Sequence, residues 1–291
     1  MPSKALSLST STGHPTYNHG PFRFRAAMSV SFDAIDACLR EPDAHAKCHA
    51  VAALWADVQA QGLASPPAEP APAIGVPGRP DRPVLVPPQQ VPRRRLGSDA
   101  GRAALVHAIA HIEFNAINLA LDAAWRFRDR PDAFYSDWLS VAADEARHFQ
   151  LLATRLDELG HVYGDFPAHD GLWDMAMKTA HSCLERMALV PRVLEARGLD
   201  VTPGMIERLR QAGDERTIAA LEVILAEEVR HVEIGTRWFH ACCAEAGVDP
   251  DETFLRLLDT RFDGRLKGPF NVSARTEAGF SKRELHAIGA A

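Results

Sequence analysis

The chain has 291 residues, of which 46% are hydrophobic and 24% are charged, as in an ordinary globular protein. Its net charge of −6 gives no general attraction to nucleic acid or to an anionic membrane, so we expect neither as a partner. The longest apolar stretches are interrupted by charges well short of 18 residues, so no membrane span is predicted. Five cysteines without a CxxC pair exclude a zinc ribbon or a four-cysteine iron site and favour the cytoplasm.

The first third of the chain is predicted to be attached to the main domain rather than to form it. Residues 1–27 are rich in Ser, Thr, Gly and His and lack an apolar signal segment, so we expect a disordered extension, with Met28 as an alternative start. Residues 28–62 have a helical pattern of apolar positions. Residues 63–97 contain ten of the twenty prolines, which predicts an extended connector over the surface.

Four long helical patterns form the body, which we interpret as one domain over residues 98–250. They cover residues 98–128, 131–160, 172–198 and 214–247, and a short helix starting at Thr202-Pro203 precedes the last. No stretch alternates strongly enough to be a strand. Residues 251–291 are predicted to be a tail that packs on the bundle. The sequence therefore predicts an all-α fold built on a four-helix bundle.

Two near-identical motifs lie in the second and fourth of these helices. Residues 144–148 read Asp-Glu-Ala-Arg-His, and residues 227–231 read Glu-Glu-Val-Arg-His. In each motif the second acid and the histidine are three residues apart, so they project from one helix face. Both pairs fall within the apolar stripe of their helix. One such pair could be a surface feature, but two pairs facing a core favour a bound cation, because bare buried carboxylates are costly.

Each half of the bundle is expected to add one further glutamate. Glu113 shares an inward stripe of small residues and precedes Glu145 by 32 positions. In the third helix, Glu195 aligns with the inner face and precedes Glu228 by 33 positions. Glu185 is the alternative because it is nearer the helix middle, although it aligns with Lys178, Ser182 and Arg192 on a face expected to be polar and outward. Pro191 is expected to distort this helix one turn before Glu195.

The predicted ligands form a charge-balanced set. Four carboxylates offset two divalent cations, and Glu with His suits iron or manganese. Metal-bound histidines usually donate their second N–H to a carboxylate, and Asp144 and Glu227 are placed to accept, each from the histidine of the opposite motif. Arg147 and Arg230 either pair with these acids or face solvent. His107 and His111 lie off the Glu113 face and are interpreted as structural or surface groups.

These motifs resemble those of the ferritin-like di-iron carboxylate proteins, which include ribonucleotide reductase small subunits, multicomponent monooxygenases, rubrerythrins and a tRNA hydroxylase. Glu195-Ala196-Arg197 is similar to the third-helix motif of that tRNA hydroxylase. Over residues 30–280 the chain is more similar to a bacterial ferritin-like family of unknown function, through stretches such as residues 111–115, 163–170 and 186–191. The resemblance implies a ferritin-like bundle and six metal ligands: Glu113, Glu145, His148, Glu195, Glu228 and His231.

The function expected from this site is O₂ activation at two iron ions to oxidise or hydroxylate a small organic molecule. Manganese or a mixed Mn/Fe pair stays open, because the ligands do not distinguish these metals. The chain has no flavin, nicotinamide or iron–sulfur motif, so electrons must come from an external donor. The alternatives are a ferritin-like ferroxidase without an organic substrate and a tRNA-modifying hydroxylase. The oligomeric state stays open, with a homodimer among the options.

Overall fold

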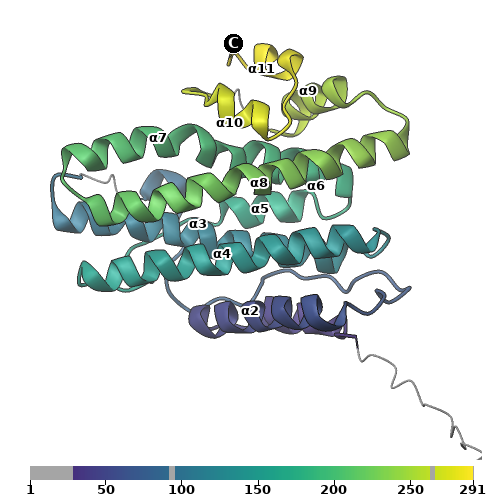
Figure 1. Cartoon of the computed structure of the whole chain (residues 1–291), viewed down its shortest axis with the longest axis horizontal. Coiled ribbons are helices and arrows are strands. Elements are labelled where there is room, and N and C mark those ends of the chain that lie inside the picture. The colour runs from purple at the N-terminus through teal and green to yellow at the C-terminus, as the bar shows by residue number, and fades with distance from the viewer. Residues whose placement is uncertain (1–28, 92–95, 263–265, 291) are drawn as a thin grey trace, which may run out of the picture.

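A computed structural model describes residues 29–91, 96–262 and 266–290 of the chain (Figure 1). Within these residues all regular secondary structure is helical, and β pairing is limited to two isolated bridges, Val30 with Leu63 and Leu85 with Ala168. The predicted all-α bundle fold is thereby confirmed. The expected extension over residues 1–27 and the alternative start at Met28 lie outside the described residues.

Four long helical segments form the central bundle. The first two are α3 (Asp99–Arg126) and α4 (Asp132–Glu158), which pack along each other as a hairpin. The third segment is continuous but irregular, and it consists of α6 (Cys183–Leu189), the π-helix η2 (Val190–Glu195) and α7 (Ala196–Gln211). The fourth is α8 (Glu215–Ala246), which packs against α4, α6, η2 and α7. The short helix α5 (Gly171–Lys178) lies in the connection from α4 to α6.

Local sequence sets the ends of these helices. The Ser98 side chain accepts from the Gly101 N–H at 3.2 Å and caps α3, and Asp214 caps α8 in the same way. Pro131 directly precedes α4, where a missing N–H costs nothing. Gly247 ends α8 in the left-handed region at φ 65°, which a glycine adopts without steric cost. Each of these features is a start or stop signal that can be read in the sequence.

The third segment differs from the sequence prediction. We predicted one helix over residues 172–198 and a new short helix from Thr202-Pro203. Instead, α5 ends at Lys178, the Ser182 side chain caps α6, and the helix then continues through Pro203 to Gln211. Proline in a helix normally leaves a carbonyl without its hydrogen bond. Here the Leu199 carbonyl, four residues before Pro203, accepts a hydrogen bond from the Asn271 amide at 3.3 Å. A contact distant in sequence therefore allows the helix to continue.

Two further layers enclose the bundle on opposite sides (Figure 1). On the α4 side lie α1 (Asp33–Arg40) and α2 (Ala44–Gln61), followed by the proline-rich connector with the short 3-10 helix η1 (Pro88–Gln90). On the other side α9 (Pro250–Arg261), α10 (Val272–Glu277) and α11 (Lys282–Ala287) cover α6, α7 and α8. The N-terminal layer is held by the buried Lys47 ammonium, which donates to Asn118 of α3 and to the carbonyls of Leu39 and Gly78.

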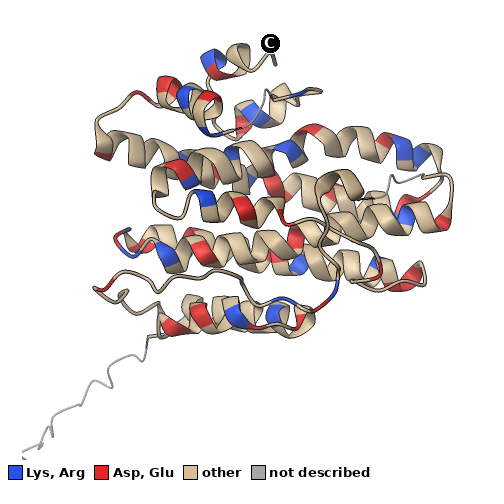
Figure 2. Cartoon of the chain, turned by 180° about the vertical axis from the view of Figure 1, so that it is seen from behind, with Lys and Arg blue, Asp and Glu red and all other residues tan. Residues whose placement is uncertain are grey.

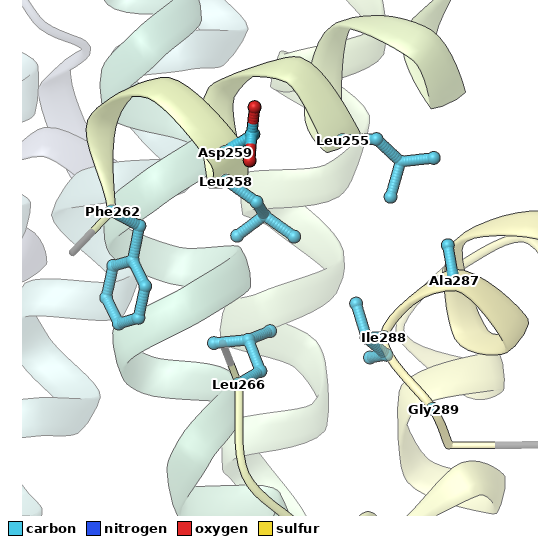
Figure 3. A pocket seen from close by; sticks show the side chains of 8 residues that line it. All are labelled: Leu255, Leu258, Asp259, Phe262, Leu266, Ala287, Ile288 and Gly289. Carbon is cyan, nitrogen blue, oxygen red and sulfur yellow. The ribbon is translucent and has the colours of Figure 1, made fainter. Parts of the chain in front are cut away.

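The surface and the core have different compositions. α3 is long and apolar enough to satisfy the length and composition test for a membrane span, but 78% of its apolar window is buried inside the protein, as for a core helix. Acidic and basic residues are interspersed along the helices (Figure 2). The C-terminal layer has a pocket of about 620 Å³ between α9 and the residues after α11, lined by Leu255, Leu258, Phe262, Leu266 and Ile288 together with Asp259 (Figure 3).

The approach of the third segment to α8 depends on a glycine. A Cβ placed on Gly235 would lie 2.3 Å from both Cβ and Cγ of Pro191, a rigid ring that cannot rotate away. We therefore expect Gly235→Ala to lower the free energy of unfolding by roughly 1–3 kcal/mol through overpacking. Chemical denaturation measures this change. Gly198→Ala in α7 is the matched control, because no atom lies within 4 Å of its Cβ position, and it should be neutral or stabilising. Equal stability of both variants would contradict the predicted close packing.

Candidate metal centre

Three bundle helices bring together Glu113 and the Glu-x-x-His pairs of the two motifs, here called the ExxH motifs, in the core. Glu113 comes from α3, Glu145 and His148 come from α4, and Glu228 and His231 come from α8. One ligand atom from each of Glu113, Glu145, His148 and Glu228 lies within 4.8 Å of the others. The exposed fraction of these five residues is 9% or less. Carboxylates and imidazoles buried this deeply need a compensating partner.

The two histidines present equivalent atoms to the carboxylates. His148 Nδ1 lies 3.4 Å from Oε2 of Glu145 and 3.4 Å from Oε2 of Glu113. His231 Nδ1 lies 3.0 Å from Oε1 of Glu145 and 3.4 Å from Oε1 of Glu228. Glu145 therefore stands between the two imidazoles, with one oxygen toward each. Glu228 Oε1 also lies 3.9 Å from His148 Nδ1, so this carboxylate is shared between the two histidines as well.

Glu195 reaches the same region from the π-helix. The residue is half-buried, yet its Oε2 atom is buried and has no hydrogen-bond partner. Burial and the neighbouring Glu228 and Glu145 carboxylates raise the pKa of Glu195 to about 8. A π turn carries one more residue than an α turn and often occurs at functional sites, and here it ends at Glu195.

Glu185 lies elsewhere. Its carboxylate lies 3.3 Å from Arg261 of α9 and 3.5 Å from His181, away from the carboxylate cluster. Of the residues aligned with it on an outward polar face, Lys178 is exposed as expected, but the prediction is wrong for Arg192, which is fully buried. Arg192 Nη2 donates to both carboxylate oxygens of Glu284 of α11 at 2.8 Å, so the C-terminal layer covers this side of the helix.

The outer nitrogens of the histidines are held by crossed contacts between the two motifs. His148 Nε2 lies 2.6 Å from Glu227 of α8, and His231 Nε2 lies 3.3 Å from Asp144 of α4. Arg147 contacts Glu227 at 2.7 Å and Asp144 at 2.8 Å. Arg230 contacts Asp144 at 2.7 Å. If both Nε2 atoms donate to these acids, both Nδ1 atoms are free to act as ligands.

Electrostatics in the cluster are dominated by burial. Burial and the Glu145 carboxylate raise the pKa of Glu113 well above its ordinary value. Burial opposes the charged form of His148, but contacts with Glu113 and Glu145 outweigh it and raise the pKa to about 11. The pKa of His231 is likewise raised well above its ordinary value against burial, through Glu228 and Glu145. In the absence of a metal cation, protons bound by His148, His231 and Glu113 therefore offset the negative charge of the carboxylate cluster.

Four buried ligand atoms make no well-aligned hydrogen bond: Glu113 Oε2, Glu145 Oε1, Glu195 Oε2 and His231 Nδ1. Three of them face one another or His148 as ligand atoms, with His231 Nδ1 3.0 Å from Glu145 Oε1 and Glu113 Oε2 3.4 Å from His148 Nδ1. Native proteins rarely leave such atoms without a partner, and an ion is one of the accepted explanations. The atoms are carboxylate oxygens and an imidazole nitrogen, which suit first-row transition metals. The donor set thus fits a metal centre by number, by type and by the direction in which the atoms point.

Sequence reasoning missed the arginines that fix the third segment. Arg186 is buried and donates to Asp122 of α3 at 2.6 Å and to Thr179 at 2.8 Å. Arg275 of α10 pairs with Asp200 of α7 at 2.8 Å, and both side chains are buried. The only available signal was an arginine inside an otherwise apolar run, as at residues 186–191, and this signal does not identify the partner.

The histidines at the start of α3 have structural contacts. His107 accepts the Gly164 N–H at 2.9 Å and stacks on the Tyr163 ring. His111 lies 2.9 Å from the Tyr163 hydroxyl and 3.1 Å from the His169 carbonyl. We interpreted these histidines as structural or surface groups. Both side chains are buried, so the structural interpretation holds and the surface interpretation is wrong. They fasten the connection after α4 to the bundle.

The fold and the carboxylate–histidine cluster define a helical protein with a candidate metal centre. Residues 40–286 match a family described as protein of unknown function, DUF455, and the chain belongs to this family. An uncharacterized protein of Haemophilus influenzae is 50% identical over 213 residues, which cover 71% of this chain and 74% of that protein. No solved structure matches the chain. The predicted membership of a family of unknown function is confirmed, and the description of that family assigns no reaction.

The third-segment ligand can be tested with a matched pair of variants. Glu195→Gln should weaken metal binding by at least about tenfold, because even outer partners of metal ligands contribute that much. Glu185→Gln should bind metal as the wild type does, since Glu185 pairs with Arg261 and His181 instead. Anaerobic titration with Fe²⁺ and elemental analysis of the washed protein provide the measurement. Loss of metal from the Glu185 variant with retention by the Glu195 variant would reverse the assignment.

Metal binding should release protons. The pKa values of about 11 for His148 and about 8 for Glu195 keep these two groups largely protonated at pH 7 in the metal-free protein. The raised pKa values of His231 and Glu113 act in the same direction, and a ligand must lose its proton to bind. The affinity should therefore fall as the pH is lowered. Calorimetric titration with Mn²⁺ in buffers of different ionisation enthalpy counts the released protons. The Glu195→Gln variant should release fewer. Heats that do not depend on the buffer would contradict the predicted protonation.

Proposed function

We propose that this protein is a ferritin-like di-iron carboxylate protein that activates O₂ to oxidise a small organic molecule. The observation that carries the proposal is the pair of crossed ExxH motifs with four buried ligand atoms that make no well-aligned hydrogen bond. The family relationship supports it only indirectly, because the description of the family gives no activity. The ferritin-like resemblance and the helical bundle are consistent with each other.

The distances suggest a role for each ligand. Glu113 lies beside His148, and the electrostatic contacts of Glu195 include His231, so each of these pairs would serve one iron. Glu145 and Glu228 both lie between the two imidazoles, so each would help to hold both irons. Four carboxylates then balance two divalent cations in a site of low dielectric.

When bound, two ferrous ions would supply the electrons for the reduction of O₂. The residues of this chain would hold the centre and exclude water, since the five ligands from α3, α4 and α8 are 9% exposed or less. Glu227 and Asp144 would accept hydrogen bonds from the Nε2–H groups of His148 and His231 and would thereby fix the tautomer of each imidazole. Their side chains are 34% and 24% exposed, so they also connect the buried imidazoles to solvent and give protons a route.

Two further components belong to the proposal. An external protein or small-molecule reductant must return electrons after each oxidation, because the chain carries no redox cofactor motif of its own. The cytoplasm is the proposed location, since it supplies such reductants and keeps thiols reduced, and the cysteines are free in the described residues. Ala120, Ala123 and Ala142 are buried small residues in the bundle that leave little side-chain bulk where a substrate would bind.

The reaction with O₂ distinguishes an oxidase or hydroxylase from a ferroxidase. We expect di-ferrous protein mixed with O₂ to oxidise two irons per chain once and then to need a reductant before reacting again. Stopped-flow spectroscopy with repeated additions of Fe²⁺ measures this. Glu228→Gln should abolish the reaction, whereas Glu233→Gln, on the exposed face of α8, should not change it. Continued oxidation and storage of iron far beyond two ions per chain would identify a ferroxidase and contradict the proposal.

A further inference from the structure

Cys183 and Cys242 lie together at one end of the bundle. Cys183 is the first residue of α6, and Cys242 lies in the last two turns of α8. Both cysteines line one pocket, and the Cys183 thiol is close enough to lower the pKa of Cys242. Cys242 follows Glu228 by 14 residues and His231 by 11 residues on the same helix, which places it about 21 Å and about 16 Å from them along the axis at 1.5 Å per residue. This pair is therefore separate from the candidate metal centre.

The environment of the pair favours a thiolate at Cys242. Arg130 Nη1 lies 3.7 Å from the Cys242 sulfur. The hydrogen bond from Cys183 and the Arg130 charge lower the pKa of Cys242 below its ordinary value, although burial opposes this. The same arginine is held by Glu245 at 2.6 Å and by Asp129 at 2.9 Å, so its position beside the sulfur is fixed. A lowered pKa increases the thiolate fraction, which is the nucleophilic form.

An open pocket of about 630 Å³ gives access to the pair. Both cysteines line it, together with Arg126, Phe127 and His181. Its volume is in the range of sites for small molecules. The three remaining cysteines do not line this pocket, and burial raises the pKa of Cys38 and Cys243 to about 11 and of Cys48 to about 12. The contact with Cys242 and burial raise the pKa of Cys183 as well, so Cys242 is the member of the pair that favours the thiolate. The three cysteines outside the pocket provide internal controls.

We propose that Cys183 and Cys242 form a redox-active dithiol that reacts at this pocket with low-molecular-weight disulfides. The Cys242 thiolate attacks one sulfur of the disulfide, a mixed disulfide forms, and one thiolate leaves. Cys183 then loses its proton and attacks the Cys242 sulfur, which forms the intramolecular disulfide and releases the second thiol. Two protein thiols are oxidised and one small disulfide is reduced to two thiols, so electrons and atoms balance. The reverse exchange restores the dithiol.

Glutathione disulfide is the probe for the test. Reduced full-length protein is incubated with it, alkylated after unfolding and mapped by mass spectrometry. The expected result is a Cys183–Cys242 disulfide, with Cys38, Cys48 and Cys243 alkylated. The Cys183→Ser variant should instead trap one glutathione on Cys242. All five cysteines alkylated in the wild type would overturn the proposal, and a trap formed only by Cys242→Ser would overturn the assignment of Cys242 as the attacking thiol.

A second measurement examines the role of Arg130. Arg130→Gln should slow the formation of the disulfide by about tenfold, because the thiolate fraction of Cys242 falls. Arg216→Gln is the control, since that arginine is 72% exposed and pairs with Glu158. Circular dichroism verifies that both variants are folded. Equal rates for folded Arg130→Gln and wild type would overturn the proposed activation by arginine.

Discussion

The repulsion among four carboxylates in the core is the constraint on which the rest of the structure depends. Glu113, Glu145, Glu195 and Glu228 have carboxylates directed to one region from which water is largely excluded. In such a medium, unpaired charges cost several kcal/mol each, on the order of the whole stability of a domain. The chain can tolerate this arrangement only if positive charge enters the cluster. The raised pKa values of His148 and His231 indicate that protons fill this role when no cation does.

The helices that carry the carboxylates must be held in place against this repulsion. The third segment is the least regular of them. It contains a π turn and a proline, both of which weaken a regular helix. Buried arginine pairs to neighbouring elements compensate: Arg186 with Asp122, Arg192 with Glu284, and Asp200 with Arg275. Removing one partner of such a pair costs about 3–5 kcal/mol, so each pair strongly disfavours movement of the helix. The C-terminal layer thereby helps to position Glu195.

The sequence predicted the features that depend on local periodicity. The two ExxH motifs lie in the apolar phase of regular helices, and the structure brings Glu145, His148, Glu228 and Glu113 together. The side-chain caps of α3 and α8, at Ser98 and Asp214, also depend only on residues that are close in sequence. The all-α bundle follows from the same patterns. The direct assignment of metal ligands stays a prediction until a metal is measured.

What the sequence did not predict depends on contacts between distant residues. Pro203 has the form of a helix start, and only the Asn271 side chain, 68 residues later, explains why the helix continues through it. Arg192 aligned with polar residues and was placed outside, because nothing local reveals Glu284 as its partner. The π turn changes the helical phase between Pro191 and Glu195, so a wheel drawn with a constant 100° per residue is unreliable there. Each error reflects a tertiary contact that overrides a local preference.

The two halves of the site are related but not equivalent. In one half Glu227 lies 2.6 Å from His148 Nε2, and in the other Asp144 lies 3.3 Å from His231 Nε2. Arg147 contacts both of these acids, whereas Arg230 contacts Asp144 and the Ser140 hydroxyl. Where each Nε2 atom donates its proton, the shorter contact lets Glu227 polarise the His148 imidazole more strongly than Asp144 polarises the His231 imidazole. The crossed acids would therefore tune the two imidazoles differently as ligands, although the two motifs are nearly identical in sequence.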